Sequence, residues 1–314
     1  MLETRELSKT FTLDRRRRLR AVDAISLTIR ECEVLGLVGE SGSGKSTFGR
    51  LLVGLLDKSA GEVLYRGERL PARYRTRDFR HYAREMQLIF QDPYASLDPR
   101  MHVEQLVGEP LRLLGERSAR HRRDQVAAWL ERVGLATDLL SRYPHEFSGG
   151  QRQRIGIARA LITRPRFLVC DEPLSALDVS IQAQMVNLLG ELQQALGLTM
   201  LFIAHDLSMV RFISDRMAVM YLGALMEVGP ADDVYGAPRH PYTRMLIDAN
   251  PVPDPVSERA RDTQLIRGEI PSAVDLPPGC RFAGRCPHVM PQCRRESPQL
   301  IQVAEDHQVA CFLY

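Results

Sequence analysis

Apolar residues gather in short runs that alternate with longer amphipathic stretches, a pattern typical of strands separated by helices. The clearest pair is Val34 to Val38, an apolar run bounded by Gly39, followed by a helix predicted over Lys45 to Leu56. This alternation predicts an α/β fold whose parallel sheet is covered on both faces. Further core strands are predicted at Phe167 to Cys170, Met200 to Ala204 and Met217 to Tyr221, with helices at Ile181 to Leu196 and Leu207 to Ile213.

The segments around this core have weaker patterns. We predict an edge strand over Leu2 to Phe11 and another over Ala21 to Arg30, where apolar and polar residues partly alternate. From about Ala95 to Thr163 the pattern is mostly helical, and Arg164-Pro165 ends it. The remaining predicted elements are a hairpin at Gly61 to Leu64 with Arg66-Gly67-Glu68 and a strand over Met86 to Phe90.

The composition bounds the classes of function. At 314 residues and 44% apolar content, the chain can build one large core and a smaller appendage. A net charge of +3 gives no basic surface of the kind that nucleic-acid binders use. The N-terminus lacks an apolar signal region and no apolar run approaches about 18 residues, so we expect the chain in the cytoplasm. Arg15 to Arg18 is interpreted as a solvated loop, with a site for anionic lipid headgroups as the alternative.

A glycine-rich phosphate loop follows the first core strand. Gly39 to Thr47 matches G-x-x-x-x-G-K-[ST] at every defined position and lies between a predicted strand and a predicted helix. Its backbone N–H groups and the helix N-terminus are expected to hold phosphates, with Lys45 on the terminal phosphates and Ser46 on Mg²⁺. The predicted ATP-binding residues here are Gly39, Glu40, Ser41, Gly42, Ser43, Gly44, Lys45, Ser46 and Thr47.

Two carboxylates end a later apolar strand. Asp171 and Glu172 follow four apolar residues, so they emerge at the carboxyl edge of the sheet, where open parallel sheets place their ligands. We expect Asp171 to hold Mg²⁺ through water and Glu172 to orient or deprotonate the attacking water. A helix-capping acidic pair is the alternative, which Pro173 directly after the pair disfavours.

Three single residues complete the predicted site. Gln91 ends a strand and is expected to touch Mg²⁺ or the attacking water. His205 closes another strand, where its imidazole is expected to contact the terminal phosphate as a catalytic group. Phe11 lies upstream of the phosphate loop and is expected to stack on adenine. Taken alone, each has a structural alternative: a loop amide, a core histidine and a core aromatic residue.

A second glycine turn, Ser148-Gly149-Gly150-Gln151, is one that a single nucleotide site does not need. Together with the phosphate loop and the acidic strand end, it predicts a protein that holds ATP in its own loop and presents this turn to an ATP held by a partner. Nucleotide binding then closes a dimer, and hydrolysis at Glu172 resets it.

Together these residues resemble the ATPase subunits of ABC transporters. The glycine turn resembles the family signature, with Phe147 where leucine is commoner, and the motifs follow one another in the family's order. The resemblance implies an α/β P-loop NTPase of ABC type, with a mostly parallel core sheet, an antiparallel β subdomain, a helical subdomain at about 95–163 and a small C-terminal extension. It also implies a dimer-contacting loop, formed by Ser175, Ala176, Leu177 and Asp178.

Longer segments resemble the dipeptide and oligopeptide importer branch of that family. The resemblance implies an ATPase domain at 1–238, an extension at 239–314, and ATP-driven import of di- or oligopeptides. Nickel, glutathione or another small solute is the alternative cargo within the branch. The segments that carry the resemblance are Phe90 to Arg100, Asp178 to Gln184, His240 to Thr243 and Pro278 to Pro287.

The same resemblance implies partners. They are two transmembrane permease subunits, a second ATPase chain that is a paralogue rather than a copy and, indirectly, an extracytoplasmic solute-binding protein. The chain would then lie at the cytoplasmic face of the membrane, held by the permeases, and bind no nucleic acid. We expect the segment after Gln91, about Asp92 to Glu109, to be the docking surface for the membrane subunits.

Four cysteines crowd into the tail, at Cys280, Cys286, Cys293 and Cys311. A cytosolic protein gains little from disulfides, and four thiolates suit an iron–sulfur cluster or a tetrahedral zinc ion. Their spacing lacks the C-x-x-C pairs usual in zinc modules. Some similar importer ATPases carry a four-iron cluster at such a tail, so the resemblance favours a [4Fe-4S] cluster over zinc or free thiols. His288 and His307 are further possible ligands, although a surface role is favoured for each.

Two other classes of function fit less well. An ABC-type ATPase acting on nucleic acid or ribosomes needs a long coiled-coil insertion, two cassettes or a basic surface, and the sequence has none of these. A regulatory subunit without hydrolysis is disfavoured because Glu172 and His205 are both present.

Overall fold

The computed structural model describes residues 1–314 with the exception of 15–16, 93–95, 176, 250–271, 275 and 277. Its described strands form one sheet of eight strands and one of four. The strands of the large sheet are β3 (Val34–Val38), β6 (Met86–Ile89), β7 (Phe167–Asp171), β8 (Thr199–Ile203), β9 (Arg216–Tyr221), β10 (Ala224–Pro230), β11 (Ile301–Ala304) and β12 (His307–Val309). Those of the small sheet are β1 (Leu2–Thr12), β2 (Arg18–Ile29), β4 (Ala60–Tyr65) and β5 (Glu68–Arg69).

The large sheet has the order β11-β12-β10-β9-β3-β8-β7-β6. Neighbouring strands from β9 to β6 pair in parallel, whereas β10, β12 and β11 add an antiparallel end. Every residue of β3, β7 and β8 is buried, which is typical of parallel strands covered on both faces. The predicted α/β fold with a mostly parallel core sheet is confirmed.

The small sheet is antiparallel and has the order β2-β1-β4-β5. The prediction of β1 as an edge strand is wrong, because β1 pairs with β2 on one side and with β4 on the other. Leu2, for example, lies opposite Ile29 of β2 on one side and Tyr65 of β4 on the other. Strands β1 and β4 lie before and after the phosphate loop in the chain. Alternation within one segment therefore cannot indicate that they pair.

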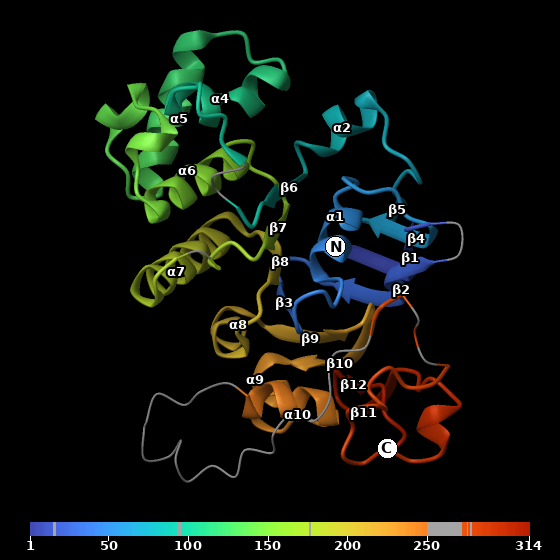
Figure 1. Ribbon diagram of the computed structural model, residues 1–314. Coiled ribbons are helices and arrows are strands. Elements are labelled where there is room, and N and C mark those ends of the chain that lie inside the picture. The colour runs from blue at the N-terminus through green and yellow to red at the C-terminus, as the bar shows by residue number, and fades with distance from the viewer. Residues whose placement is uncertain (15–16, 93–95, 176, 250–271, 275, 277) are drawn as a thin grey trace.

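Helices cover the large sheet. The side chains of α7 and α8 pack on one face, while α1 and the small sheet form a second core on the other. In Figure 1, α4, α5 and α6 stand at the end of the molecule far from the C-terminus. The helices are α1 (Lys45–Leu52), α2 (Thr76–Tyr82), α4 (Val103–Leu113), α5 (Ala119–Arg132), α6 (Gly149–Leu161), α7 (Val179–Leu196), α8 (Leu207–Ile213), α9 (Ala231–Gly236) and α10 (Pro241–Asp248). Short 3-10 turns are η1 (Thr137–Ser141), η2 (Pro144–Glu146) and η3 (Gln292–Arg294).

Helix α1 ends at Leu52, four residues before the predicted end at Leu56. The chain leaves the helix because Gly54 takes a left-handed φ of 74°. Among the described residues, none of the helices has both the length and the apolar character that crossing a bilayer requires.

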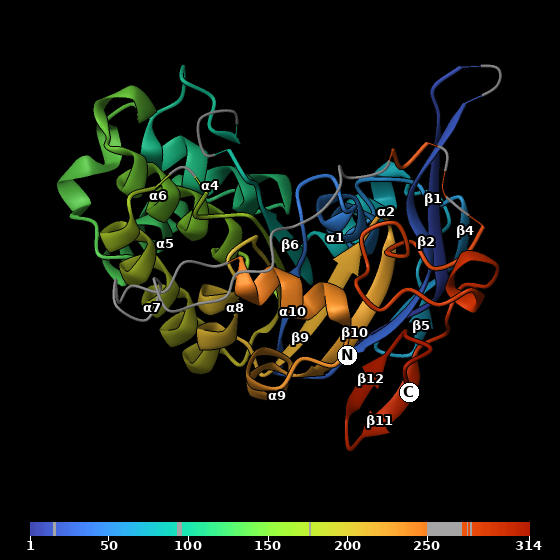
Figure 2. The same ribbon diagram turned by 60° about the horizontal axis from the view of Figure 1, so that its bottom comes forward.

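The C-terminal extension continues the large sheet. Strand β12 pairs with β10 and carries β11 at its outer side, as Figure 2 shows. The sequence pattern missed β10 because Glu227 interrupts its apolar run. The carboxylate of Glu227 is fully buried and accepts hydrogen bonds from the backbone N–H groups of Arg239 and His240 and from the ring of His307. The favoured surface role for His307 is therefore wrong.

Candidate nucleotide-binding site

The phosphate loop joins β3 to α1 in a conformation that only glycine adopts easily. Gly44 has a φ of 104°, and a Cβ there would lie 2.0 Å from the carbonyl oxygen of Ala21. Gly39 has a φ of 153°, and a Cβ there would lie 2.1 Å from the carbonyl oxygen of Met220. These close approaches hold the loop against the large sheet and the start of β2.

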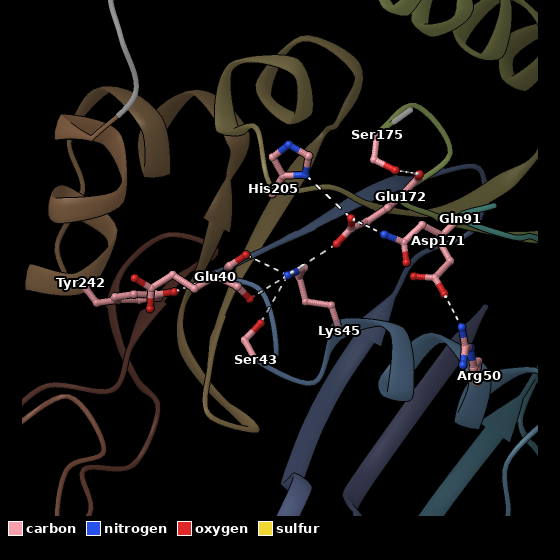
Figure 3. A network of polar contacts seen from close by, with 11 residues as sticks. Glu40, Ser43, Lys45, Arg50, Gln91, Asp171, Glu172, Ser175, His205 and Tyr242 are labelled. Carbon is pink, nitrogen blue, oxygen red and sulfur yellow. Dashed lines mark hydrogen bonds and ion pairs between the residues drawn. The ribbon is translucent and has the colours of Figure 1, made fainter. Parts of the chain in front are cut away.

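Lys45 begins α1, and its ammonium reaches back to the first residues of the loop (Figure 3). Its side chain is 3% exposed, and its ammonium donates to the carbonyl oxygens of Gly39 at 2.8 Å and Glu40 at 2.9 Å. Burial lowers the pKa of Lys45, and the carboxylates of Glu172, Asp171 and Glu40 oppose that shift. The loop therefore holds a buried cation at the place where phosphates are expected.

Glu172 joins three of the predicted residues at the carboxyl edge of the sheet. Its Oε2 accepts a hydrogen bond from Gln91 Nε2 at 3.1 Å and lies 3.8 Å from His205 Nδ1. Its Oε1 lies 3.9 Å from Lys45 Nζ. Figure 3 shows Gln91, His205 and Lys45 approaching this carboxylate from three directions. The structure thus brings together residues that four separate segments supply.

Asp171 precedes this carboxylate and is fully buried. One of its oxygens lies 3.4 Å from Arg50 Nη2, whereas the other, Oδ1, is buried and has no hydrogen-bond partner among the described residues. An orphaned carboxylate oxygen is costly unless a cation or an ordered water satisfies it. Oxygen ligands of this kind suit Mg²⁺, so the residues present fit a magnesium ion.

The predicted signature turn lies outside this network. Ser148 caps α6. Its hydroxyl accepts a hydrogen bond from the backbone N–H of Gln151 at 3.4 Å, and the side-chain Oε1 of Gln151 accepts one from the backbone N–H of Ser148 at 3.0 Å. A Cβ at Gly150 would lie 2.9 Å from Ile181 Cγ2, so glycine lets α6 approach α7 closely. In the described part of the chain, no hydrogen bond or ion pair joins any residue of the turn at 148–151 to Lys45 or Glu172.

The predicted dimer-contacting loop, Ser175 to Asp178, follows soon after Glu172. The Ser175 hydroxyl donates to the Glu172 carbonyl oxygen at 3.2 Å, Leu177 packs against the large core, and Asp178 precedes α7. Ala176 lies outside the described residues. Phe11 is half-buried in β1, with Lys9 Nζ 5.1 Å from the centre of its ring, and its stacking on adenine stays a prediction.

The sequence missed four residues that hold this site in place. Arg50 faces Asp171, and Gln182 donates to the carbonyl oxygens of Leu174 and Leu177 at 3.0 Å each. Tyr242 and Arg285 both contact Glu40 of the phosphate loop. Most of these contacts join segments far apart in the chain, so no local motif indicates them.

The four tail cysteines line one small cavity of about 10 Å³, together with His240, Phe282 and His288. Burial raises the pKa of Cys280 to about 11 and also raises the pKa values of Cys286 and Cys311. No group of three or more His, Cys, Asp or Glu side chains in the described ranges is placed to hold a metal ion. As arranged here, the thiols do not fit an iron–sulfur cluster, and the structure gives that expectation no support.

A parallel sheet with a phosphate loop, an acidic strand end, an antiparallel side sheet and a helical unit defines an ATP-binding cassette. Two family models match the chain: ABC transporter, over residues 22–175, and the C-terminal region of oligopeptide/dipeptide transporters, over residues 226–293. The chain belongs to the family of oligopeptide-transporter ATP-binding proteins of ABC type.

Relatives match along nearly the full length. YkfD of Bacillus subtilis (strain 168) is 52% identical over 315 residues, which cover 100% of this chain and 95% of YkfD. The oligopeptide transport ATP-binding protein OppF of Escherichia coli (strain K12) is 50% identical over 294 residues, 93% of this chain and 87% of OppF.

Solved structures share the cassette fold. The bacterial ABC transporter cassette MJ0796, solved as a dimer, superposes with a TM-score of 0.68 at 27% identity. The match covers 74% of this chain and 99% of MJ0796. A dimeric post-hydrolysis state of the same cassette, bound to ADP and Pi, matches with the same TM-score of 0.68.

Proposed function

We propose that this chain is the ATP-hydrolysing subunit of a membrane ABC transporter that imports di- or oligopeptides. The observation that carries the proposal is the meeting of Lys45, Gln91, Glu172 and His205 at one edge of the sheet, in a chain of this family. OppF, which is named for oligopeptide transport, supports peptides as the cargo. Nickel, glutathione or another small solute remains the alternative cargo.

The side chains divide the chemistry among them. The Glu172 carboxylate accepts a proton from the attacking water or orients it, and Gln91 and His205 hold that carboxylate and the terminal phosphate in line. Lys45 exchanges its carbonyl partners for phosphate oxygens when ATP enters the loop. Ser46, Gln91 and Asp171 would hold Mg²⁺, which supplies charge neutralisation for the phosphates.

The proposed function is tested with the chain assembled with its permeases in proteoliposomes. We expect ATP hydrolysis that rises when a peptide-loaded binding protein is added, with uptake of labelled peptide. The same vesicles supplied with ADP in place of ATP are the control. Hydrolysis without uptake of any peptide, but with uptake of nickel or glutathione, would transfer the proposal to that cargo.

The signature turn, Ser148 to Gln151, is proposed to act on an ATP held by a second ATPase chain. Among the described residues, no hydrogen bond or ion pair joins this turn to Lys45 or Glu172 of its own chain, and MJ0796 was solved as a dimer. We propose a paralogue as the second chain. Light scattering on the isolated chain with Mg-ATP checks this: a chain that stays monomeric agrees with a paralogue, and a dimer contradicts it.

A groove of about 550 Å³ supports the docking hypothesis for the segment after Gln91. Ser96, Leu97 and Glu109 from that segment line it, together with Phe79 of α2 and Leu113 of α4. Leu113 is 64% exposed, which leaves an apolar side chain free for a partner. We propose that a cytoplasmic segment of a permease subunit fills this groove and holds the chain at the cytoplasmic face of the membrane.

A [4Fe-4S] cluster at the tail cysteines is kept as a separate hypothesis. It rests on the resemblance of the tail to importer ATPases that carry such a cluster, while the small volume of the cavity weighs against it. Protein purified without oxygen should contain iron and acid-labile sulfide in near-equal amounts, at about four per chain. A Cys286→Ser variant should lose both. Absence of both from the wild-type protein would leave reduced thiols or zinc.

A further inference from the structure

Glu40, the second residue of the phosphate loop, is held by the C-terminal extension. Arg285 donates from its two Nη atoms to the two carboxylate oxygens of Glu40, at 2.8 and 2.9 Å. The side chain of Arg285 is 4% exposed and that of Glu40 is 18% exposed. A buried bidentate pair of this kind is stronger and more directional than a surface ion pair.

The main chain of Glu40 is held from the same side. Its N–H donates to the hydroxyl of Tyr242 at 3.0 Å, and Tyr242 is fully buried at the start of α10 (Figure 3). Arg285 also donates to the hydroxyl of Tyr221 at 3.3 Å, and its guanidinium lies over the Tyr221 ring. Two residues of the extension therefore fix one residue of the phosphate loop.

The position and charge of Glu40 both bear on nucleotide binding. Its carbonyl oxygen accepts from Lys45 Nζ at 2.9 Å, so the backbone of Glu40 helps to set where the ammonium lies. Its carboxylate brings a negative charge into a loop that must receive phosphates, and burial weakens the screening of such a charge by solvent. Arg285 neutralises this carboxylate without displacing the loop.

We infer that Arg285 is a positioning residue for ATP binding, through which the C-terminal extension becomes part of the nucleotide site. The inference rests on the proposed role of Gly39 to Thr47 in binding ATP. It assigns the extension a direct effect on ATP affinity, carried by a residue 245 positions from the loop.

The test is titration of Mg-ATP and Mg-ADP into the purified full-length chain. Arg285→Ala leaves the Glu40 carboxylate unpaired, so we expect the Kd for ATP to rise about tenfold, equivalent to about 1.4 kcal/mol. The loss should be larger for ATP than for ADP, and it should shrink at high salt because salt screens the repulsion. Adding Glu40→Gln to Arg285→Ala should restore most of the affinity, because the repelling charge is then gone.

Arg281→Ala is the matched control. Arg281 is another arginine of the same segment, with a side chain 12% exposed, but its partners are the Asp23 carboxylate of β2 and the Leu222 carbonyl oxygen, both outside the phosphate loop. Its loss should leave the Kd for ATP unchanged. If Arg285→Ala does not fold, Arg285→Lys carries the test, because lysine keeps the charge and loses the fork; its smaller loss should again be reversed by Glu40→Gln.

A purely structural pair gives a different result. Arg285→Ala would then lower the melting temperature while the Kd for ATP stays the same, or any loss of affinity would be insensitive to salt and to Glu40→Gln. Either pattern overturns the inference. A wild-type chain that binds no ATP would instead refute the proposed function, so the two failures are distinguishable.

Discussion

Glu172 combines backbone strain with chemistry. Its φ of 45° is unusual for a residue with a Cβ and costs on the order of 1–3 kcal/mol, which the surroundings must offset. Its N–H donates to Ile203 at 3.0 Å and the Ser175 hydroxyl holds its carbonyl oxygen, so the strained conformation is fixed at both ends. In this conformation the carboxylate accepts a hydrogen bond from Gln91 and lies 3.8 Å from His205 Nδ1.

This geometry predicts that Glu172→Gln separates hydrolysis from binding. The amide keeps the shape of the side chain and loses the proton acceptor, so we expect kcat for ATP hydrolysis to fall by about 10²–10⁴-fold. Binding of Mg-ATP should persist in a titration of the same variant. Glu191→Gln, an exposed carboxylate of α7, is the control. A Glu172→Gln chain with wild-type turnover would remove Glu172 from the mechanism.

His240 predicts a pH dependence of stability. Burial lowers its pKa to about 4, although the backbone carbonyl of Ala310 opposes the shift. The pKa of His240 in the folded chain lies below the unfolded value of 6.5. Its contribution to the free energy of unfolding is therefore fully present above pH 6.5 and is lost as pH falls toward 4. Linkage gives a loss of about 2 kcal/mol at pH 5.

Urea unfolding at pH 7.5 and pH 5 measures this loss against a matched variant. The imidazole accepts the N–H of Tyr242 and so caps α10, and His240→Asn keeps a capping acceptor without a titrating group. The neighbouring Glu227, which accepts the His240 N–H, is present in both proteins. The wild-type chain should lose about 2 kcal/mol more than His240→Asn. Equal losses would exclude His240 as the source.

At the scale of helices, the groove between α2, α4 and α6 predicts a contact with a permease subunit. Phe79→Glu on α2 and Leu113→Glu on α4 place charge on its apolar wall, on helices that carry none of the predicted nucleotide-site residues. We expect the isolated chain to bind Mg-ATP with an unchanged Kd and to lose co-purification with the permeases. Leu55→Glu is the control, because Leu55 is an exposed leucine (46%) outside the groove. Loss of Mg-ATP binding with intact assembly would contradict docking there.

At the scale of the whole molecule, two nucleotides suffice to close a dimer. One ATP at a hundredfold its Kd stabilises the binding state by about 2.7 kcal/mol, so two supply about 5.4 kcal/mol. Moving a conformational equilibrium from 1:99 to 99:1 needs about 5.5 kcal/mol. If each chain completes the site of its partner, as proposed, two bound nucleotides supply about the free energy that closure needs.

Ser148→Arg tests this dependence. The arginine should block the approach of the signature turn to the partner's ATP, so turnover of the assembled transporter falls tenfold or more, about 1.4 kcal/mol or more. Mg-ATP should still bind to the variant chain. Ser118→Arg is the control, because Ser118 caps α5 in the same way that Ser148 caps α6. Equal turnover in both variants would exclude the proposed role of the turn.

Sequence patterns alone were enough to predict the phosphate loop, the acidic strand end and the core strands β3, β7 and β8. Their signals are local: glycines impose the loop conformation, and continuous apolar runs identify buried parallel strands. The placement of Gln91 and His205 beside Glu172 followed from the same rule, since the carboxyl ends of parallel strands share one edge.

Contacts between distant segments could be found only in the folded chain. The tertiary structure placed β1 between β2 and β4, buried His307 against Glu227, and set Arg285 on Glu40. Each of these depends on how whole elements pack, and a buried charge finds its partner only once the surrounding core has formed. Local periodicity describes one element at a time, so it carries no information about contacts as far apart in the chain as Leu2 and Tyr65, or Glu40 and Arg285.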